Sequence, residues 1–233
     1  MISFVIPAHN EERHLGTTLA ALFASAQAVG EPFEVIVVND TSTDHTRAIA
    51  EAGGARVVDV THRHIALTRN TGARASVGEV LFFVDADTQA NPAAIRAGLR
   101  AIRAGAIGGG CAFRYDGPVP LWAKIVHPIG IEAARLLKLV GGCFLFCRRE
   151  AFTAVGGFSE RYRVGEDVAF VNDLKRRGRF VVPREMVTTS NRKLDRMKPR
   201  AAISLLLRFA ARGPDMHFTQ EELDLWYGPA ARD

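Results

Sequence analysis

The stretch LFFVDADTQANP, residues 81–92, places buried-type and charged residues side by side. An apolar run typical of a strand that is covered on both faces leads directly into Asp85 and Asp87. Two carboxylates this close repel each other, so the pair indicates a partner that relieves the repulsion: a cation, a proton donor or a substrate. Alternation along an extended chain puts the two acids on one side and the small Ala86 on the other, where it would leave room for a ligand.

Three earlier apolar runs also predict buried strands: SFVIP (residues 3–7), FEVIVVND (33–40) and ARVVDV (55–60). Helical patterns lie between the strands. Leu15, Leu19, Leu22 and Phe23 have helical spacing behind Asn10, which can cap that helix, and residues 41–54 run from a Thr/Ser start to a Gly-Gly stop. This alternation predicts an α/β fold with a mainly parallel central sheet flanked by helices.

Polar clusters follow three of these strands. They are PAHNEE (residues 7–12), NDTSTD (39–44) and DADTQANP (85–92). Ligands of such sheets bind beyond the carboxyl ends of the strands, so we expect the three clusters to converge on one edge.

The second half of the chain is less regular. Residues 106–115 and 141–149 predict strands whose glycines allow a backbone or ligand to approach closely, and residues 165–178, GEDVAFVNDLKRRG, predict a helix with acids at its start. Beyond Arg184 the chain is basic over residues 192–200, and residues 201–213 are amphipathic. With no linker to divide it, we expect one domain over residues 1–190 and a small basic, helical extension over 191–233.

Composition narrows the class of protein only modestly. The 233 residues are 48% hydrophobic and 24% charged, which is ordinary globular usage. A net charge of +5 fits an anionic ligand, a membrane surface or nucleic acid alike. Cys111, Cys143 and Cys147 lack a second ligand pair for zinc and are interpreted as reduced core residues. The start of the chain shows no basic leader, so we expect a cytoplasmic protein. Charges interrupt the apolar region 121–147, which argues against a membrane-spanning helix but allows a helix that lies on a membrane surface.

Four motifs in order resemble those of the family 2 glycosyltransferases of the GT-A fold. They are FVIPAHNEE (residues 4–12), VIVVNDTSTDHT (35–46), LTRNTGARASVGEVLFFVDADT (67–88) and GEDVAFVNDLKRRG (165–178). The resemblance implies a single GT-A, Rossmann-like domain, with a nucleotide-sugar-binding half over residues 1–105 and an acceptor half over 106–190. It also implies a hexosyltransferase-like enzyme that moves a sugar, with inversion, from a nucleotide-diphosphate sugar to an acceptor hydroxyl. Mg2+ or Mn2+ would be the cofactor.

The resemblance also implies roles for the donor-side residues. Pro7, Ala8, His9 and Glu11 would surround the nucleoside. Where the family commonly has two acids this chain has Asn39 and Asp40, so Asp40 would accept a hydrogen bond from the base, and uracil, thymine and guanine all remain open. Asp87 would be the direct metal ligand of the DxD motif, with Asp85 on the ribose or the metal. The planar fork of Arg69 suits a phosphate.

By resemblance to the family's acidic pair, Asp167 would be the catalytic base and Glu166 would position the acceptor. Acids at a helix start also stabilise the helix dipole, and that dipole weakens a base. Gly141 and Gly142 could admit the acceptor or form a tight turn. His217 could complete the metal shell, although a lone histidine is more often structural. The basic stretch could be a lid over the diphosphate, a contact with anionic lipid or a solvated face.

Other functions fit the sequence less well. A Mg2+-dependent phosphohydrolase of the haloacid dehalogenase kind would follow its acid pair with a hydroxyl at position 89, where this chain has Gln89, and a sugar-nucleotide pyrophosphorylase would have a glycine-rich basic loop in place of PAHNEE. A non-catalytic sugar-nucleotide or nucleic-acid binding module is the remaining alternative. Residues 192–200 contain no aromatic residue, so we expect no nucleic-acid partner. A lipid-linked and a carbohydrate acceptor both stay open, as do peripheral contact with the inner face of the membrane and the oligomeric state.

Overall fold

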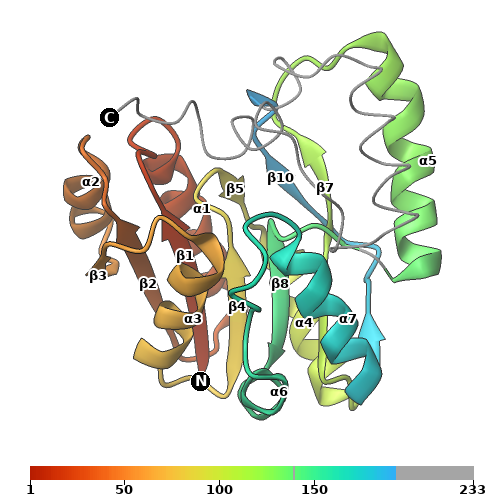
Figure 1. The fold of residues 1–233 in the computed structure, drawn as a ribbon. Coiled ribbons are helices and arrows are strands. Elements are labelled where there is room, and N and C mark those ends of the chain that lie inside the picture. The colour runs from red at the N-terminus through yellow and green to blue at the C-terminus, as the bar shows by residue number, and fades with distance from the viewer. Residues whose placement is uncertain (139, 193–233) are drawn as a thin grey trace.

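The computed structural model describes residues 1–138 and 140–192. Its centre is a seven-stranded sheet in the order β3-β2-β1-β4-β8-β6-β9, with helices on its two faces (Figure 1). The strands are β1 (Ile2–Ala8), β2 (Phe33–Asp40), β3 (Arg56–Val60), β4 (Val80–Val84), β6 (Gly108–Gly110), β8 (Phe144–Arg148) and β9 (Phe180–Val181). Only β8 opposes the others, since it pairs antiparallel with β4 and β6 while the other pairs of this sheet are parallel. The predicted α/β fold with a mainly parallel sheet is therefore confirmed.

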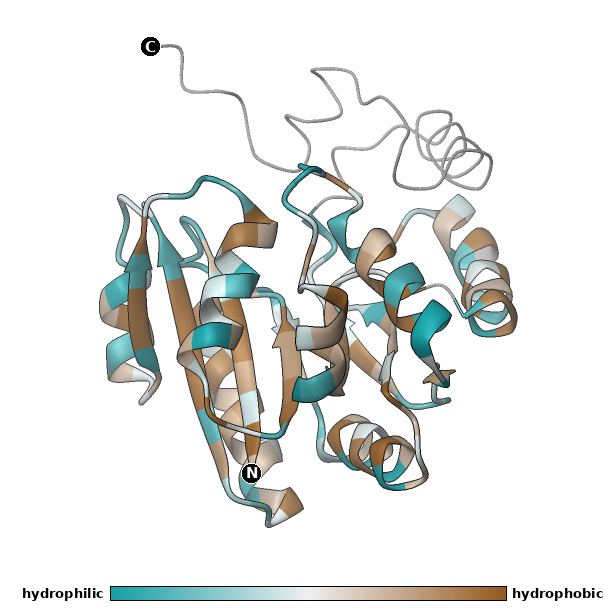
Figure 2. Ribbon diagram, turned by 60° about the horizontal axis from the view of Figure 1, so that its bottom comes forward, coloured by the Kyte–Doolittle hydropathy of each residue, from teal (hydrophilic) through white to brown (hydrophobic). Residues whose placement is uncertain are grey.

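Two apolar clusters bury the two faces of the sheet. Phe4 and Phe82 belong to the cluster that includes α1 (Leu15–Val29) and α4 (Pro92–Arg103). Val5 and Phe83 belong to the cluster on the opposite face, with α3 (Ile65–Ala75), α6 (Arg149–Val155) and α7 (Glu166–Arg177). Neighbouring residues of one strand thus enter different clusters, which is why the central strands are mostly apolar (Figure 2). The remaining helices are α2 (Thr46–Ala52) and α5 (Leu121–Leu137).

A second, three-stranded sheet lies beside the first and was not predicted from the sequence. Its order is β5 (Thr88–Gln89), β10 (Met186–Thr189) and β7 (Ala112–Tyr115). Because β5 follows Asp87 directly, the acid pair lies between the two sheets. The backbone N–H of Ser190 donates to the carbonyl of Asp87 at 3.2 Å, so the end of β10 is fixed against the acid pair.

The acid pair itself is not extended, and the predicted alternation is wrong there. Strand β4 ends at Val84, and the N–H of Thr88 donates to the carbonyl of Asp85 at 3.0 Å to close a turn. Ala86 is 3% exposed within the core, and its carbonyl accepts a hydrogen bond from the Thr18 hydroxyl. It does not leave room for a ligand.

Asn10 does not cap the first helix. That helix begins at Leu15, and the Asn10 side chain instead accepts the N–H of Thr43 at 2.8 Å, from a positive φ of 53°. The helix predicted over residues 165–178 is confirmed as α7. The expectations for residues 193–233, including the amphipathic run and His217, lie outside the described residues. Among the described helices, none is both long enough and apolar enough to cross a membrane.

Candidate active site

The carboxyl ends of β1, β2 and β4 meet at one edge of the central sheet, as expected from the polar clusters. His9 Nδ1 lies 2.6 Å from the carbonyl of Asp40, and the N–H of Glu11 donates to the Thr46 hydroxyl at 2.7 Å. These bonds attach the loop after β1 to the loop after β2. The turn after β4 reaches the same edge and is held there by Thr18 of α1.

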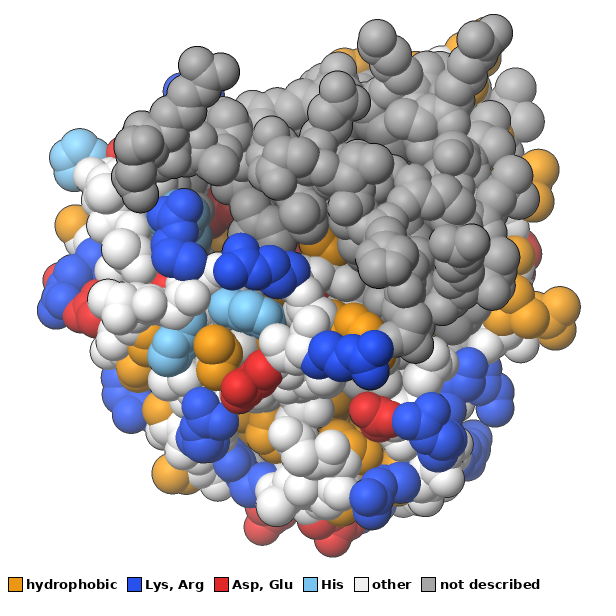
Figure 3. Space-filling view, in the orientation of Figure 1, with side chains coloured by type: hydrophobic (Ala, Val, Ile, Leu, Met, Phe, Trp, Pro, Cys, Tyr) orange, Lys and Arg blue, Asp and Glu red, His pale blue; other side chains and the backbone are white. Residues whose placement is uncertain are grey.

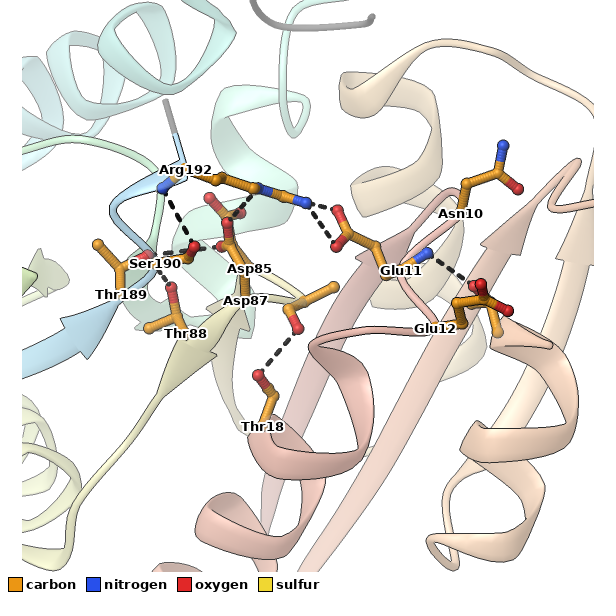
Figure 4. A network of polar contacts seen from close by, with 12 residues as sticks. Asn10, Glu11, Glu12, Thr18, Asp85, Asp87, Thr88, Thr189, Ser190 and Arg192 are labelled. Carbon is orange, nitrogen blue, oxygen red and sulfur yellow. Dashed lines mark hydrogen bonds and ion pairs between the residues drawn. The ribbon is translucent and has the colours of Figure 1, made fainter. Parts of the chain in front are cut away.

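Arg192 bridges the first and third of these loops (Figure 4). Its terminal nitrogens donate to the two carboxylate oxygens of Glu11 at 2.8 and 2.7 Å, and its Nε lies 2.9 Å from Asp87 Oδ2. The side chains of Glu11 and Asp87 are only 12% and 7% exposed. Burial raises the pKa of Glu11, and the charge of Arg192 opposes that shift. A cation is therefore held where acids of two motifs converge.

A second guanidinium, that of Arg69, lies deeper in the protein between Asp85 and Glu166. Arg69 Nη2 donates to Asp85 at 2.8 Å and Arg69 Nη1 donates to Glu166 at 2.7 Å. The Arg69 side chain is 2% exposed and lies over the ring of Phe158. Burial and the neighbouring charge of Asp167 raise the pKa of Glu166 to about 7, although Arg69 opposes the shift. One buried cation thus joins the acid pair after β4 to the acid pair that starts α7.

Asp167 is half-buried beside this cluster and has a different partner. Its Oδ2 accepts the backbone N–H of Gly142 at 2.6 Å. A Cβ on Gly142 would lie 2.8 Å from Arg69 Nη2 and 3.0 Å from Asp167 Oδ2. Gly142 is not among the residues with positive φ, so close approach to these side chains, not a left-handed turn, explains the glycine.

The role predicted for Asp40 does not fit its position. The Asp40 carboxylate accepts backbone N–H groups of His62, Arg63 and His64 at 2.8, 2.9 and 3.2 Å, and the hydroxyl of Thr68 at 2.9 Å. Burial alone would raise the pKa of Asp40, but these hydrogen bonds lower it. Its acceptor capacity is used to hold residues 62–64 at the start of α3, so it is not free to accept from a nucleobase.

Two further predictions need correction. The phosphate-binding role of Arg69 does not fit its burial, because Arg69 is paired with Glu166 inside the protein. The positioning role predicted for Glu166 stays a prediction. Ala8 is 3% exposed and contributes to the core, whereas Pro7 is half-buried at the end of β1. His9, Glu11, Asp85, Asp87 and Asp167 are the predicted residues that the structure brings to the rim of the site.

Arg192 is the residue that the sequence predictions missed. It was one member of a basic stretch, and nothing in that stretch indicated that its first arginine meets Glu11, 181 residues away in sequence. The only signal was indirect and came from the hydroxyl-rich TTS segment at residues 188–190, shortly before Arg192. Thr189 Oγ1 of this segment accepts a hydrogen bond from the Thr88 hydroxyl at 3.0 Å. Pairing between β5 and β10 carries Arg192 to the acids.

The carboxylates of Asp85 and Asp87 suit a hard divalent cation whose remaining ligands come from a bound substrate. Within the described residues no group of three or more His, Cys, Asp or Glu side chains is arranged to hold a metal. Mg2+ commonly takes one or two carboxylates together with substrate phosphates, and Asp87 with Asp85 supplies that number. The guanidinium of Arg192 shows that the rim carboxylates accommodate positive charge.

Comparisons with known proteins identify the family and the fold. A family model described as "Glycosyl transferase family 2" matches residues 3–156. The chain is 32% identical over 169 residues to validoxylamine A glucosyltransferase of Streptomyces hygroscopicus subsp. limoneus, covering 66% of this chain and 36% of that protein. It is 34% identical over 104 residues to the undecaprenyl-phosphate 4-deoxy-4-formamido-L-arabinose transferase of Pseudomonas paraeruginosa, covering 40% and 29%. The chain thus spans well under half of these curated relatives.

Two solved structures share the fold. The mannosyltransferase PcManGT from Pyrobaculum calidifontis, in complex with GDP-Man and Mn2+, superposes with a TM-score of 0.72 at 18% identity, over 98% of this chain and 68% of that one. Glucosyl-3-phosphoglycerate synthase from Mycobacterium tuberculosis, in complex with Mn2+, UDP and phosphoglyceric acid, superposes with a TM-score of 0.61 at 21% identity, over 91% and 75%.

Gly142→Ala tests the close approach at Asp167. The added methyl would push against Arg69 and Asp167, so we expect the free energy of unfolding to fall by about 1–3 kcal/mol. Gly141→Ala is the matched control, because a Cβ there meets nothing within 4 Å. Urea denaturation followed by circular dichroism measures the two variants. Equal stabilities would show that Gly142 is not packed as described.

Proposed function

The chain belongs to glycosyl transferase family 2, and from this premise we propose that it transfers a sugar from a nucleotide-diphosphate sugar to an acceptor hydroxyl, with inversion and with a divalent metal ion. One observation carries the proposal: Arg69 joins Asp85 of the donor-side motif to Glu166 of the acidic pair on α7. Donor and acceptor chemistry would therefore meet at one edge of the sheet. Residues 1–105 would form the donor half and residues 106–190 the acceptor half.

The donor would lie along the rim formed by His9, Glu11, Asp85 and Asp87. Relatives in fold are complexed with GDP-mannose or with UDP, so a guanine and a uracil donor are both supported. The loop held by Asp40 would border the nucleoside, since Arg63 Nη1 lies 2.9 Å from His9 Nε2. Asp40 would then act on the donor through the loop that it positions.

Asp87, together with Asp85, would hold Mg2+ or Mn2+, with oxygens of the donor diphosphate completing the ligands. When bound, the ion would neutralise charge that develops on the leaving diphosphate. Arg192 now pairs with Asp87 and Glu11, so it would have to release Asp87 when the donor enters. The released guanidinium would be free to pair with a phosphate oxygen.

Asp167 would act as the general base. It is half-buried at the start of α7, and the Gly142 N–H fixes the orientation of its carboxylate. A base must lie within hydrogen-bond reach of the acceptor hydroxyl and, for inversion, on the face opposite the leaving group. Glu166 would be a positioning residue, because it contacts Arg69 inside the protein and not the acceptor.

The acceptor class follows from the relatives only in outline. Their names include a transferase that acts on undecaprenyl phosphate and one that acts on validoxylamine A, so both lipid-linked and carbohydrate acceptors are supported. We propose a cytoplasmic enzyme that reaches a lipid-linked acceptor by peripheral contact with the inner face of the membrane.

Asp87→Ala and Asp167→Asn test the two halves of the mechanism. A thermal-shift screen of UDP-, GDP- and dTDP-sugars with Mn2+ first identifies the donor, since a ligand specific for the folded state raises the melting temperature. With water as the acceptor, we expect metal-dependent release of nucleoside diphosphate to fall at least about a hundredfold in each variant.

Asp173→Asn, on the same helix as Asp167 but toward its other end, should keep wild-type release. Wild-type turnover in both site variants would exclude the assigned roles. Donor binding without any release by the wild type would favour a binding module.

Arg192→Ala tests the pairing at the rim. Removing the guanidinium leaves Glu11 and Asp87 without their cation, so we expect Mn2+ in the absence of donor to bind about tenfold more tightly. Isothermal titration calorimetry measures the affinity. Arg74→Ala, which removes an exposed arginine of α3, controls for the change in net charge. Unchanged or weaker Mn2+ binding in Arg192→Ala would contradict competition for these carboxylates.

A further inference from the structure

Helix α5 carries an unusual concentration of exposed apolar side chains. The exposed large hydrophobic residues of the described chain are Met1, Val77, Leu121, Val126, Ile129, Leu136 and Leu137, and the last five belong to α5. Ile129 is 67% exposed and Leu136 is 83% exposed. Orange side chains stand out at the right-hand edge of Figure 3, on the side where Figure 1 places α5. Clusters of this kind mark interaction sites.

The helix is attached to the body by its opposite face. His127 Nε2 lies 2.9 Å from the carbonyl of Phe113, and the His127 ring packs against Phe113 and Tyr115. Ala123, four residues earlier, is 2% exposed. The outward residues Val126, Ile129, Ala133 and Leu136 recur at i, i+3, i+7 and i+10, which makes one continuous stripe. The stripe is therefore a helix face and not a scatter of single residues.

Exposed cations lie near the two ends of α5 and on segments next to it. Lys124 and Lys138 are exposed near the two ends of α5, and Arg114 and Arg184 are exposed on neighbouring segments. The exposed acid within the helix, Glu132, is ion-paired with Arg135. Lys124 and Arg114 also line a cavity of about 250 Å³ at the start of the helix. An apolar helix face with cations at its ends is the pattern of a helix that lies in the interface of an anionic bilayer.

The two ends of α5 are connected to the candidate active site. At the N-terminal end, Asn191 donates to Asp116 Oδ1 at 3.2 Å and to the Pro118 carbonyl at 2.8 Å, directly before Arg192. At the C-terminal end, the chain continues from Leu137 to Gly142, which contacts Asp167. A surface that docks on α5 would thus lie beside the acceptor side of the site.

We propose that the apolar face of α5 docks on the surface of an anionic lipid bilayer and so brings the active site to an acceptor held in that bilayer. This inference rests on the proposed function, including its lipid-linked acceptor, and specifies the surface that docks on the bilayer. A second copy of the chain fits the surface less well, because a symmetric interface through α5 would bring the cations at the ends of one helix toward those at the ends of the other. A bilayer of acidic lipids offers apolar depth and negative charge together.

Co-sedimentation with vesicles tests the proposal. The full chain is mixed with vesicles of phosphatidylcholine alone, or of equal parts phosphatidylcholine and phosphatidylglycerol, and the bound fraction is measured. We expect binding to the mixed vesicles, reduced about a hundredfold in Ile129→Gln/Leu136→Gln because two large apolar groups no longer enter the interface. Lys124→Gln/Lys138→Gln should lose about tenfold on mixed vesicles and little on neutral ones.

Val77→Gln is the matched control, since Val77 is 69% exposed but lies away from α5, between α3 and β4. Melting curves of each variant confirm folding. The proposal would be overturned if the wild type did not bind vesicles, or if Val77→Gln lost binding as much as the Ile129→Gln/Leu136→Gln variant. It would also be overturned if vesicle binding were absent and sedimentation velocity showed a dimer that the Ile129→Gln/Leu136→Gln variant abolishes.

Hydrolysis of the donor in solution, in which water takes the sugar in place of the acceptor and nucleoside diphosphate is released, separates this proposal from the proposed function. The Ile129→Gln/Leu136→Gln variant should keep that release while it loses the vesicles. Release without vesicle binding by the wild type would sink the docking surface alone. Vesicle binding without release would sink the transferase assignment.

Discussion

A buried cation between two acids is the interaction on which the rest of the site depends. Arg69 on α3 is 2% exposed and donates to Asp85 after β4 and to Glu166 at the start of α7. A buried charge is tolerated only when it is paired, and removing one partner of such a pair costs about 3–5 kcal/mol. Three elements that are distant in sequence are therefore locked to one guanidinium, and the spacing of their acids is fixed before any ligand arrives.

The two arginines of the site differ in burial: Arg69 lies inside the protein and Arg192 lies at the rim. Arg69 is buried and pairs with the buried Glu166 and with Asp85, whose side chain is 23% exposed. Arg192 stabilises Glu11 and Asp87 at the rim, with a side chain that is 37% exposed. A pair at the rim is exchangeable, because water, a metal ion or a phosphate can take over its interactions. The buried Arg69 thus keeps the acids fixed near the proposed base. The ion pairs of Arg192 can be replaced where the charged donor would enter.

The sequence predicted most of the fold because the relevant signals are local. Apolar runs and helical spacing located the strands before Asp40 and Asp85 and the helix after Gly165, and strand ends in a parallel sheet meet by construction. The failures concern contacts that no local pattern encodes. Arg69 pairs with Glu166, which is 97 residues away in sequence. Strand β5 has only two residues and is too short to recognise in the sequence, but its pairing with β10 places Arg192 beside its partners. Asp40 was misjudged because its polar position after a strand suits a ligand and a loop anchor equally.

The central claim is that Arg69 couples the donor-side acids to the acidic pair of α7. A double-mutant cycle in the free energy of unfolding, with Asp85→Asn, Glu166→Gln and the double variant, measures that coupling directly. If the two acids share Arg69, each single change still leaves the guanidinium one of these two carboxylates, and the double change leaves it neither. We therefore expect the double variant to lose at least about 1 kcal/mol more than the sum of the single losses. Additivity within about 0.5 kcal/mol would show that the two acids act independently, and the account would be contradicted.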